Sequence, residues 1–221
     1  MNNLILTAAL ALMASTLYWL YQREARKGSR ARADIFGECT SLLAQASQTS
    51  QASGFPTLKG NYQGYQVVLA VHADTLSVRK LPPLWLTVTL RGKQRTRGSL
   101  DIMVRPQNTG FHSPAWDWDD SVVIPPGWPQ HALVKYRGAV APLDLLDAVV
   151  PGLFSDERMK ELLVTPDVVR LTYMAKQADR GEYLLMRNAV FDGVPIPQEV
   201  VAALLQSAAG LRQQLEGANQ P

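Results

Sequence analysis

The sequence has little of what metal and redox chemistry require. Of its 221 residues, one is a cysteine and three are histidines. The single thiol, Cys39, cannot form an intramolecular disulfide, and one thiol is too few for a cysteine-based zinc site or an iron–sulfur cluster. The phosphate-binding loop, the dinucleotide fingerprint and the zinc-protease motif are absent as well. We therefore expect no cofactor, and the sequence favours a protein without catalytic activity.

Charged residues are also scarce, at 19% of the chain, and the basic ones are concentrated in two patches. The whole chain has a formal net charge of +3, each patch has a net charge of +4, and the remainder is therefore at −5. The basic residues of the two patches are Arg23, Arg26, Lys27, Arg30 and Arg32, and Arg91, Lys93, Arg95 and Arg97. We expect them to contact anionic lipid, where each Lys or Arg contributes about 1 kcal/mol. For residues 91–97 a solvated turn is the alternative, and no nucleic acid partner is expected because aromatic residues for base stacking are missing there.

The first 22 residues contain no charged side chain, and residues 4–21 are almost uniformly apolar. Eighteen helical residues extend about 27 Å, close to the ~30 Å hydrocarbon core of a bilayer. Tyr18, Trp19 and Tyr21 stand at the end of this run, where aromatic rings favour the headgroup region. A cleaved signal peptide would begin with basic residues, which residues 1–3 lack. The pattern predicts a transmembrane helix over residues 1–22.

The position of the positive charge predicts how this helix is oriented. Lys and Arg residues near a span stay on the cytoplasmic side, and here all of them follow the helix. We expect the N-terminus outside and the C-terminal domain in the cytoplasm, with a periplasmic domain as the alternative. The predicted organisation is a transmembrane helix (1–22), a basic juxtamembrane stretch with a helix and linker (23–53), and one soluble domain (54–221).

The hydrophobic periodicity predicts an α+β domain of antiparallel β-hairpins with segregated helices. A period of three to four predicts helices over 34–48, 142–150, 156–164 and 197–216. Alternating or β-branched runs predict strands over 58–62, 65–71, 84–90, 99–104, 121–124, 132–136, 167–174 and 182–190. We expect strand 84–90 to pair with 99–104 across the turn 91–98, and strand 167–174 to pair with 182–190.

One cluster of polar residues offers an alternative, metal-binding or enzymatic function. His112, Asp117, Asp119, Asp120 and His131 lie close together in the sequence, and carboxylates and imidazoles are the usual ligands of divalent cations. A calcium loop beginning at Asp117 would need a glycine where Val122 stands and a glutamate where Trp128 stands. A turn capped by aspartates therefore explains the cluster more simply.

Three stretches of the chain resemble uncharacterised bacterial proteins that are membrane-anchored by a single span. They are residues 65–86, the run Pro125-Pro126-Gly127-Trp128-Pro129 and the run Glu161-Leu162-Leu163-Val164-Thr165-Pro166. The resemblance covers about residues 60–215, carries over no catalytic residue and implies a bacterial inner membrane. We therefore expect a single-pass membrane-anchored protein whose soluble domain binds or scaffolds, with membrane lipid and another membrane protein as the expected partners.

Overall fold

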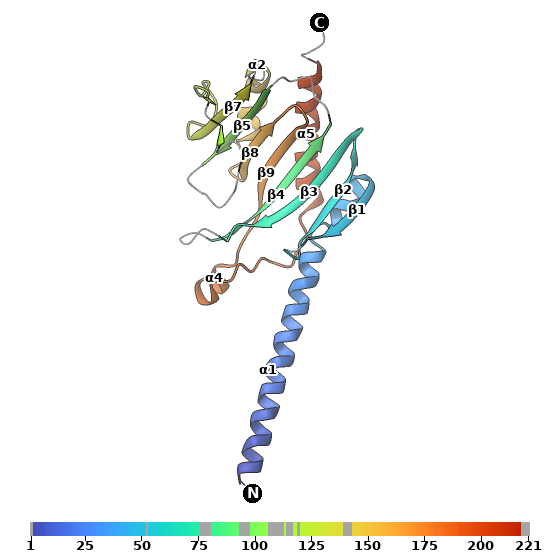
Figure 1. Ribbon diagram of the computed structural model, residues 1–221, viewed down its shortest axis with the longest axis vertical. Coiled ribbons are helices and arrows are strands. Elements are labelled where there is room, and N and C mark those ends of the chain that lie inside the picture. Colours follow the sequence, from blue (N-terminus) through green and yellow to red (C-terminus); the bar gives the residue numbers. More distant parts are fainter. Residues whose placement is uncertain are drawn as a thin grey trace.

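The computed structural model describes residues 2–51, 53–75, 81–92, 98–105, 113, 117–118, 120–138 and 143–217. A long N-terminal helix stands away from an antiparallel sheet, and the C-terminal helix covers one face of that sheet (Figure 1). The helical elements are α1 (Asn2–Ala33), the 3-10 turn η1 (Gly37–Leu42), α2 (Leu143–Asp147), α3 (Val150–Leu153), α4 (Arg180–Met186) and α5 (Gln198–Gly217). The strands are β1 (Ala44–Ser50), β2 (Pro56–Tyr62), β3 (Tyr65–Ala73), β4 (Pro83–Arg91), β5 (Gly98–Val104), β6 (Asp120–Ser121), β7 (Ala132–Gly138), β8 (Met159–Val164) and β9 (Val168–Gln177). The predicted α+β class is confirmed.

Within the described residues the nine strands form one sheet in the order β1-β2-β3-β4-β9-β8-β5-β7-β6. Every neighbouring pair is antiparallel. The late hairpin β8–β9 lies between β4 and β5, so the predicted pairing of strand 84–90 with 99–104 is wrong. Each of those strands instead has one neighbour from the β8–β9 hairpin.

Strand β8 replaces a predicted helix. Residues 156–164 were expected to be helical, but Met159–Val164 pair with β5 on one side and β9 on the other. All six residues of β8 are buried. A strand that is covered on both faces shows no alternation of apolar and polar residues, so its sequence can resemble a helix.

The helix predicted over residues 34–48 is also wrong. Its apolar residues Ile35, Phe36 and Cys39 are buried around η1, and the chain then turns into β1. Every residue of β1 is exposed, and the strand is held through its backbone pairing with β2. A polar strand at the edge of a sheet has no hydrophobic pattern by which it could be recognised.

The strand predicted over residues 182–190 is instead the short helix α4. Asp179 accepts a hydrogen bond from the Glu182 backbone N–H at 2.8 Å and caps the start of the helix. Arg187 ends it in the left-handed conformation at φ 53°. The backbone N–H of Asp179 also donates to Val190 at 2.8 Å, which closes the segment into a compact loop.

The main core lies between the sheet and α5. Leu205, Ala208 and Leu211 of α5 are buried in the same apolar cluster as Val88 of β4 and Leu171 of β9. The helix predicted over 197–216 is thereby confirmed. So are the predicted strands 58–62, 65–71, 84–90, 99–104, 132–136 and 167–174. In place of strand 121–124 the structure has only Asp120–Ser121, and in place of helix 142–150 it has α2 and α3.

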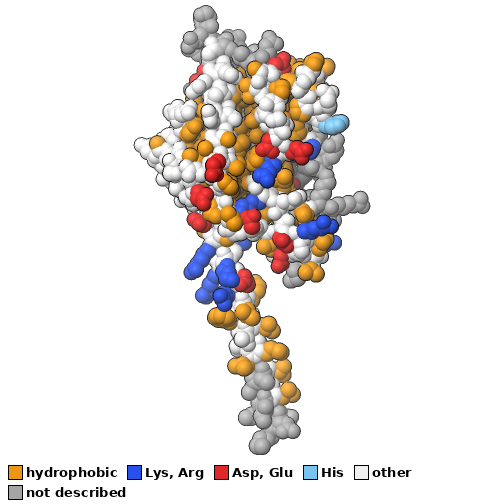
Figure 2. All heavy atoms as spheres, turned by 180° about the vertical axis from the view of Figure 1, so that it is seen from behind, with side chains coloured by type: hydrophobic (Ala, Val, Ile, Leu, Met, Phe, Trp, Pro, Cys, Tyr) orange, Lys and Arg blue, Asp and Glu red, His pale blue; other side chains and the backbone are white. Residues whose placement is uncertain are grey.

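Helix α1 confirms that residues 2–22 are helical, whereas their predicted crossing of a membrane is not confirmed. Among the described residues, the structure contains no helix that is both long and apolar enough to cross a membrane. The apolar side chains that the structure describes on α1 between residues 6 and 21 are exposed (Figure 2), among them Leu12 at 74% and Leu17 at 60%.

The junction of α1 with the domain is firmly packed. Ile35 and Phe36, directly after the helix, are buried in the main core. The Ile35 carbonyl accepts a hydrogen bond from the Ile196 N–H at 2.9 Å, and the Ala33 carbonyl accepts one from Nε2 of Gln48 at 2.8 Å. The helix is therefore attached both to β1 and to the segment before α5.

A buried arginine fixes the far end of α5. The Arg212 guanidinium lies 4.7 Å from the centre of the Tyr65 ring, and its Nε donates to Glu216 at 3.0 Å. The Tyr65 hydroxyl donates to the same carboxylate at 3.0 Å. Gly92, at the end of β4, has a φ of +151° and lies directly against this guanidinium.

We expect Gly92→Ala to destabilise the protein. An added Cβ would lie 2.8 Å from Nη2 of Arg212, and alanine rarely adopts this φ. The expected loss is about 1–3 kcal/mol of unfolding free energy, measured by urea denaturation of the full chain in a non-ionic detergent. Gly210→Ala is the matched control: a Cβ there meets no atom within 4 Å, so a gain of about 0.5–1 kcal/mol is expected. An unchanged unfolding free energy in Gly92→Ala would contradict the close packing of Gly92 against Arg212.

Candidate functional site

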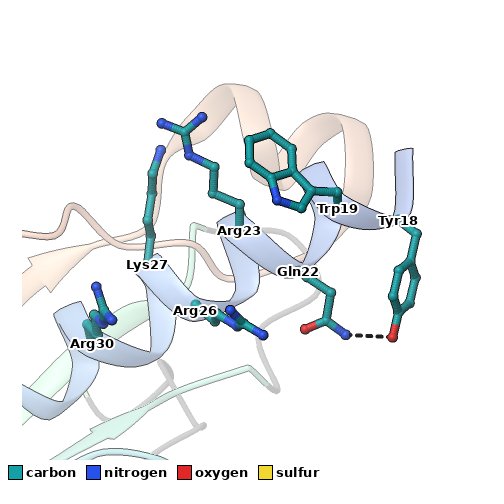
Figure 3. Close-up of a pocket in the computed structure, with 7 residues that line it drawn as sticks. All are labelled: Tyr18, Trp19, Gln22, Arg23, Arg26, Lys27 and Arg30. Atoms are coloured by element: carbon teal, nitrogen blue, oxygen red, sulfur yellow. Dashed lines mark hydrogen bonds between the residues drawn. The ribbon is translucent and has the colours of Figure 1, made fainter. Parts of the chain in front are cut away.

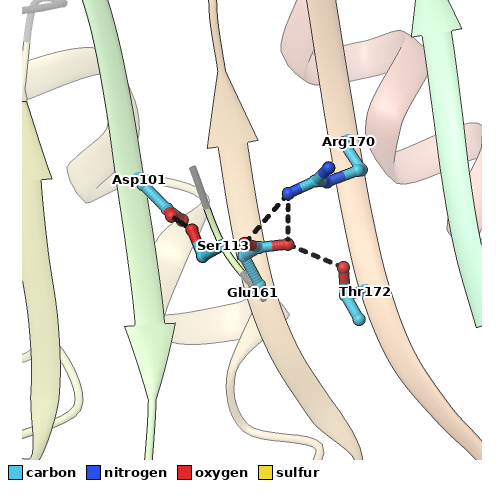
Figure 4. A network of polar contacts seen from close by, with 5 residues as sticks. All are labelled: Asp101, Ser113, Glu161, Arg170 and Thr172. Atoms are coloured by element: carbon cyan, nitrogen blue, oxygen red, sulfur yellow. Dashed lines mark hydrogen bonds and ion pairs between the residues drawn. The ribbon is translucent and has the colours of Figure 1, made fainter. Parts of the chain in front are cut away.

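The sheet face opposite α5 carries a buried polar cluster (Figure 4). Glu161 on β8 lies in register with Thr172 on β9, and Asp101 on β5 lies in register with Leu163 on β8. Because side chains alternate along a strand, these residues point to the same face as Arg170 on β9. The neighbouring strands thus bring two carboxyl groups, a guanidinium and a hydroxyl together.

Glu161 is the centre of the cluster. Its side chain has no exposed surface, and both of its oxygens accept hydrogen bonds of 3.1 Å from Nη2 of Arg170. Thr172 donates a further hydrogen bond of 2.7 Å from its hydroxyl. A buried carboxylate requires such partners, because transfer of an unpaired charge from water costs several kcal/mol. Glu161 is therefore well compensated as an ion.

Asp101 has less compensation. The Ser113 hydroxyl donates a hydrogen bond to its Oδ2, whereas none of the described residues donates one to its buried Oδ1. Burial and the neighbouring Glu161 carboxylate raise the pKa of Asp101 well above its ordinary value of 3.8. A proton on Oδ1 would be a donor toward Glu161 and would balance the cluster, with one anion against one cation. The arrangement can therefore hold one proton between two carboxyl groups.

Two further polar side chains are held near this face. Lys160, at the irregularity between Met159 and Glu161, donates from Nζ to the carbonyls of Val104 and Arg105 at 2.8 and 2.7 Å. Burial lowers the pKa of His72, and the nearby Arg170 guanidinium lowers it further. Both effects favour the neutral imidazole at neutral pH, because a charged imidazole would be buried and would be repelled by the Arg170 guanidinium.

The sequence did not single out Asp101, Glu161 or Arg170. Asp101 stands alone in an apolar run, 100–104, which is a recognisable signal of a buried charge. Glu161 was assigned to a predicted helix, and on a helix it would not face Asp101. Pairing across strands creates the cluster, and pairing cannot be read from one strand at a time.

The basic residues after the apolar run, predicted to form a juxtamembrane stretch, lie on the same helix α1. Arg23, Arg26, Lys27, Arg30 and Arg32 are exposed near the domain (Figure 2). Four of them line one shallow groove along the helix together with Tyr18, Trp19 and Gln22 (Figure 3). The Arg23 guanidinium lies 5.5 Å from the centre of the Trp19 ring, and Gln22 donates to the Tyr18 hydroxyl at 3.0 Å. The aromatic side chains thus stand at one end of this groove, and the basic side chains line the rest of it.

The second basic patch lies elsewhere on the molecule. Arg91 is exposed at the end of β4, next to Gly92. Gly92 contacts Arg212 near the C-terminal end of α5, whereas the start of α5 lies beside the end of α1. Arg91 and the basic residues of α1 are thus at opposite ends of the domain. Lys93, Arg95 and Arg97 lie outside the described residues, and their contact with lipid stays a prediction.

The residues of the predicted metal cluster are only partly described. Asp117 and His131 are exposed, and Asp120 lies in β6, paired with Tyr136. His112 and Asp119 lie outside the described residues. Among the residues that the structure does describe, no group of three or more His, Cys, Asp or Glu side chains is placed to hold a metal ion. The metal-binding alternative stays a prediction.

Comparison with known proteins shows a distant structural likeness and no match in sequence. No protein family model matches the chain, and no curated protein is significantly similar to it. A solved structure, that of the mycobacterial trehalose monomycolate transport factor A, TtfA, aligns over 80% of this chain and 75% of its own. The sequence identity is 9% and the TM-score is 0.38. A likeness at this level is distant.

The raised pKa of Asp101 makes a prediction for the pH dependence of stability. A carboxyl group whose pKa is higher in the folded state stabilises fully below its unfolded value, near 3.8, and this contribution is lost as the pH rises through the folded pKa. Asp101→Asn mimics the protonated carboxyl and removes this titration. We expect the variant to be at least as stable as the wild type at pH 8, and its unfolding free energy to fall less between pH 5 and pH 8.

Glu161→Gln is the contrasting variant, measured in the same way. It removes the carboxylate that faces Arg170, and a loss of about 3 kcal/mol is expected. If Asp101→Asn were the more damaging of the two at pH 8, Asp101 would be ionised in the folded protein and the shared proton would be disproved.

Proposed function

We propose that the protein is a membrane-anchored binding protein, held to a lipid bilayer by α1 and presenting the sheet domain beside the membrane. One observation carries the proposal: the N-terminal part of α1 extends from the domain with its apolar side chains exposed (Figure 1). Leu6, Leu10, Leu12, Met13, Leu17 and Leu20 are all about half exposed or more. A folded protein rarely leaves such a surface in water, since each leucine contributes roughly 1.5–3 kcal/mol when it is buried.

The side chains after the apolar run support lipid as the partner. Tyr18, Trp19 and Tyr21 are exposed, and Arg23 and Arg26 follow within two turns. This is the order of groups from the edge of the hydrocarbon core to the headgroups, where rings favour the interface and cations meet anionic phosphates. The setting that we propose is a bacterial inner membrane, with the domain in the cytoplasm.

A binding role suits the domain better than catalysis. Its buried polar residues Glu161 and Asp101 are engaged with neighbours inside the sheet. Strand β1 is fully exposed and lies at one end of the sheet among the described strands, so one row of its backbone groups faces outward. Such an edge can accept a strand from another protein. We propose a second membrane protein as that partner.

Membrane extraction tests the anchor. The full chain, expressed in bacteria, is expected to stay with the membrane pellet through washes with high salt and with alkaline carbonate. The double variant Leu10→Lys/Leu12→Lys is expected in the supernatant, because each lysine in the hydrocarbon core costs about 2.5–3.5 kcal/mol. The control Leu10→Ile/Leu12→Ile keeps the apolar surface and is expected to stay in the pellet. Release of the wild-type chain by either wash would overturn the proposed anchor.

Sidedness and crossing are tested together. A green fluorescent protein fused to the C-terminus is expected to fluoresce, and alkaline phosphatase fused there is expected to be inactive, because both report a cytoplasmic domain. The variant Asn3→Cys is expected to react in whole cells with a maleimide that cannot pass the membrane. Active phosphatase would place the domain in the periplasm. An inactive phosphatase with an unreactive Asn3→Cys would show that α1 enters the bilayer without crossing it.

A further inference from the structure

Helix α4 exposes two leucines at the end of the domain where α1 leaves it. Leu185 is 83% exposed and Leu184 is 57% exposed. Tyr183, on the other side of the same turn, is buried. The helix therefore packs by one side and presents two neighbouring leucines to the outside.

The position of α4 is fixed relative to α1. The Ala178 N–H before the helix donates to the Pro82 carbonyl at 2.9 Å, next to the start of β4. Asp192, after the helix, forms an ion pair with Lys176 of β9. An added Cβ on the next residue, Gly193, would lie 3.4 Å from the Cβ of Ala31 on α1. Figure 1 shows α4 below the sheet, set apart from α1 but at the level of the part of α1 that is nearest the domain. That part of α1 carries the basic residues 23–32.

The chemistry of α4 fits the boundary between headgroups and hydrocarbon. Arg180 and Arg187 are exposed at its two ends, and the Arg187 guanidinium lies 5.7 Å from the centre of the Tyr183 ring. Asp179 and Glu182 balance these two charges, so the leucines rather than net charge would provide the attraction. Short elements with apolar and basic side chains bind membrane surfaces by burying the apolar part beneath the headgroups.

We infer that α4 is a second membrane contact, which inserts Leu184 and Leu185 into the same leaflet that α1 enters. The inference rests on the proposed anchoring by α1. With α1 in the bilayer and its basic residues at the headgroups, α4 lies at the same level as those residues. The domain is then held to the leaflet at two points, which fixes the face that it turns toward the membrane.

A fluorescent probe on α4 tests this contact in the full chain. The variant Leu185→Cys is labelled with a polarity-sensitive nitrobenzoxadiazole maleimide and reconstituted in vesicles of phosphatidylethanolamine and phosphatidylglycerol. The native Cys39 does not interfere, because it is buried and burial raises the pKa of its thiol to about 11. We expect the emission of the probe to be shifted to the blue relative to the same probe in detergent-free buffer. We also expect it to be quenched by lipids that carry a nitroxide on the acyl chain.

Two further variants make the result specific. Leu184→Cys is expected to respond like Leu185→Cys, which guards against a local disturbance at one position. Val123→Cys is the control: Val123 is 90% exposed, and the preceding residue is bonded to β7, which lies away from α1 (Figure 1). Its emission is expected to be the same with and without the nitroxide lipid.

The outcomes separate the two proposals. If the chain floats with the vesicles but probes at 184 and 185 respond no more than the probe at 123, α1 anchors the protein and the role of α4 is disproved. If the chain does not float with the vesicles at all, the anchoring itself is disproved. Equal quenching at all three positions would also overturn the inference, because the domain would then have no defined face toward the membrane.

Discussion

The β8–β9 hairpin is the element on which the rest of the domain depends. Among the described strands, β1 to β4 are joined to β5, β6 and β7 through this hairpin. Its inner face supplies Leu162 and Leu171 to the core beneath α5, and its outer face supplies Glu161 and Arg170 to the polar cluster. Because two halves of the sheet meet through it, both the core and the cluster form only when these late residues have taken their places between β4 and β5.

The central position of the hairpin also explains which parts of the fold the sequence predicts well. Strands with one covered face, such as β3 and β4, show alternation or β-branched runs, and α5 shows a helical stripe between a proline and a glycine. Strand β8 is buried on both faces and β1 is exposed on both, so neither has the period of a strand. Strands that follow each other in the chain usually pair, so β4 and β5 were expected to be neighbours. The later strands β8 and β9 lie between them instead.

The candidate sites also differ in how far the sequence predicts them. The residues of α1 are contiguous in the chain, so their order, apolar residues followed by aromatic and basic ones, can be recognised from the sequence alone. The cluster of Asp101, Glu161 and Arg170 depends on the register of three strands, and α4 depends on two local caps, at Asp179 and Arg187. Those relations join residues through backbone geometry, and no pattern of side chains along the sequence reports them.

The junction after α1 has a mechanical consequence. Ile35 and Phe36 are buried in the core, and hydrogen bonds tie the end of the helix to β1 and to the segment before α5. No flexible hinge separates the helix from the sheet within residues 30–37, because the backbone N–H groups of Asp34, Ile35 and Gly37 are all bonded within this turn. If α1 enters a bilayer as proposed, a tilt of this helix to match a thicker or thinner membrane would tilt the whole sheet with it, and membrane thickness would set the angle between the domain and the membrane.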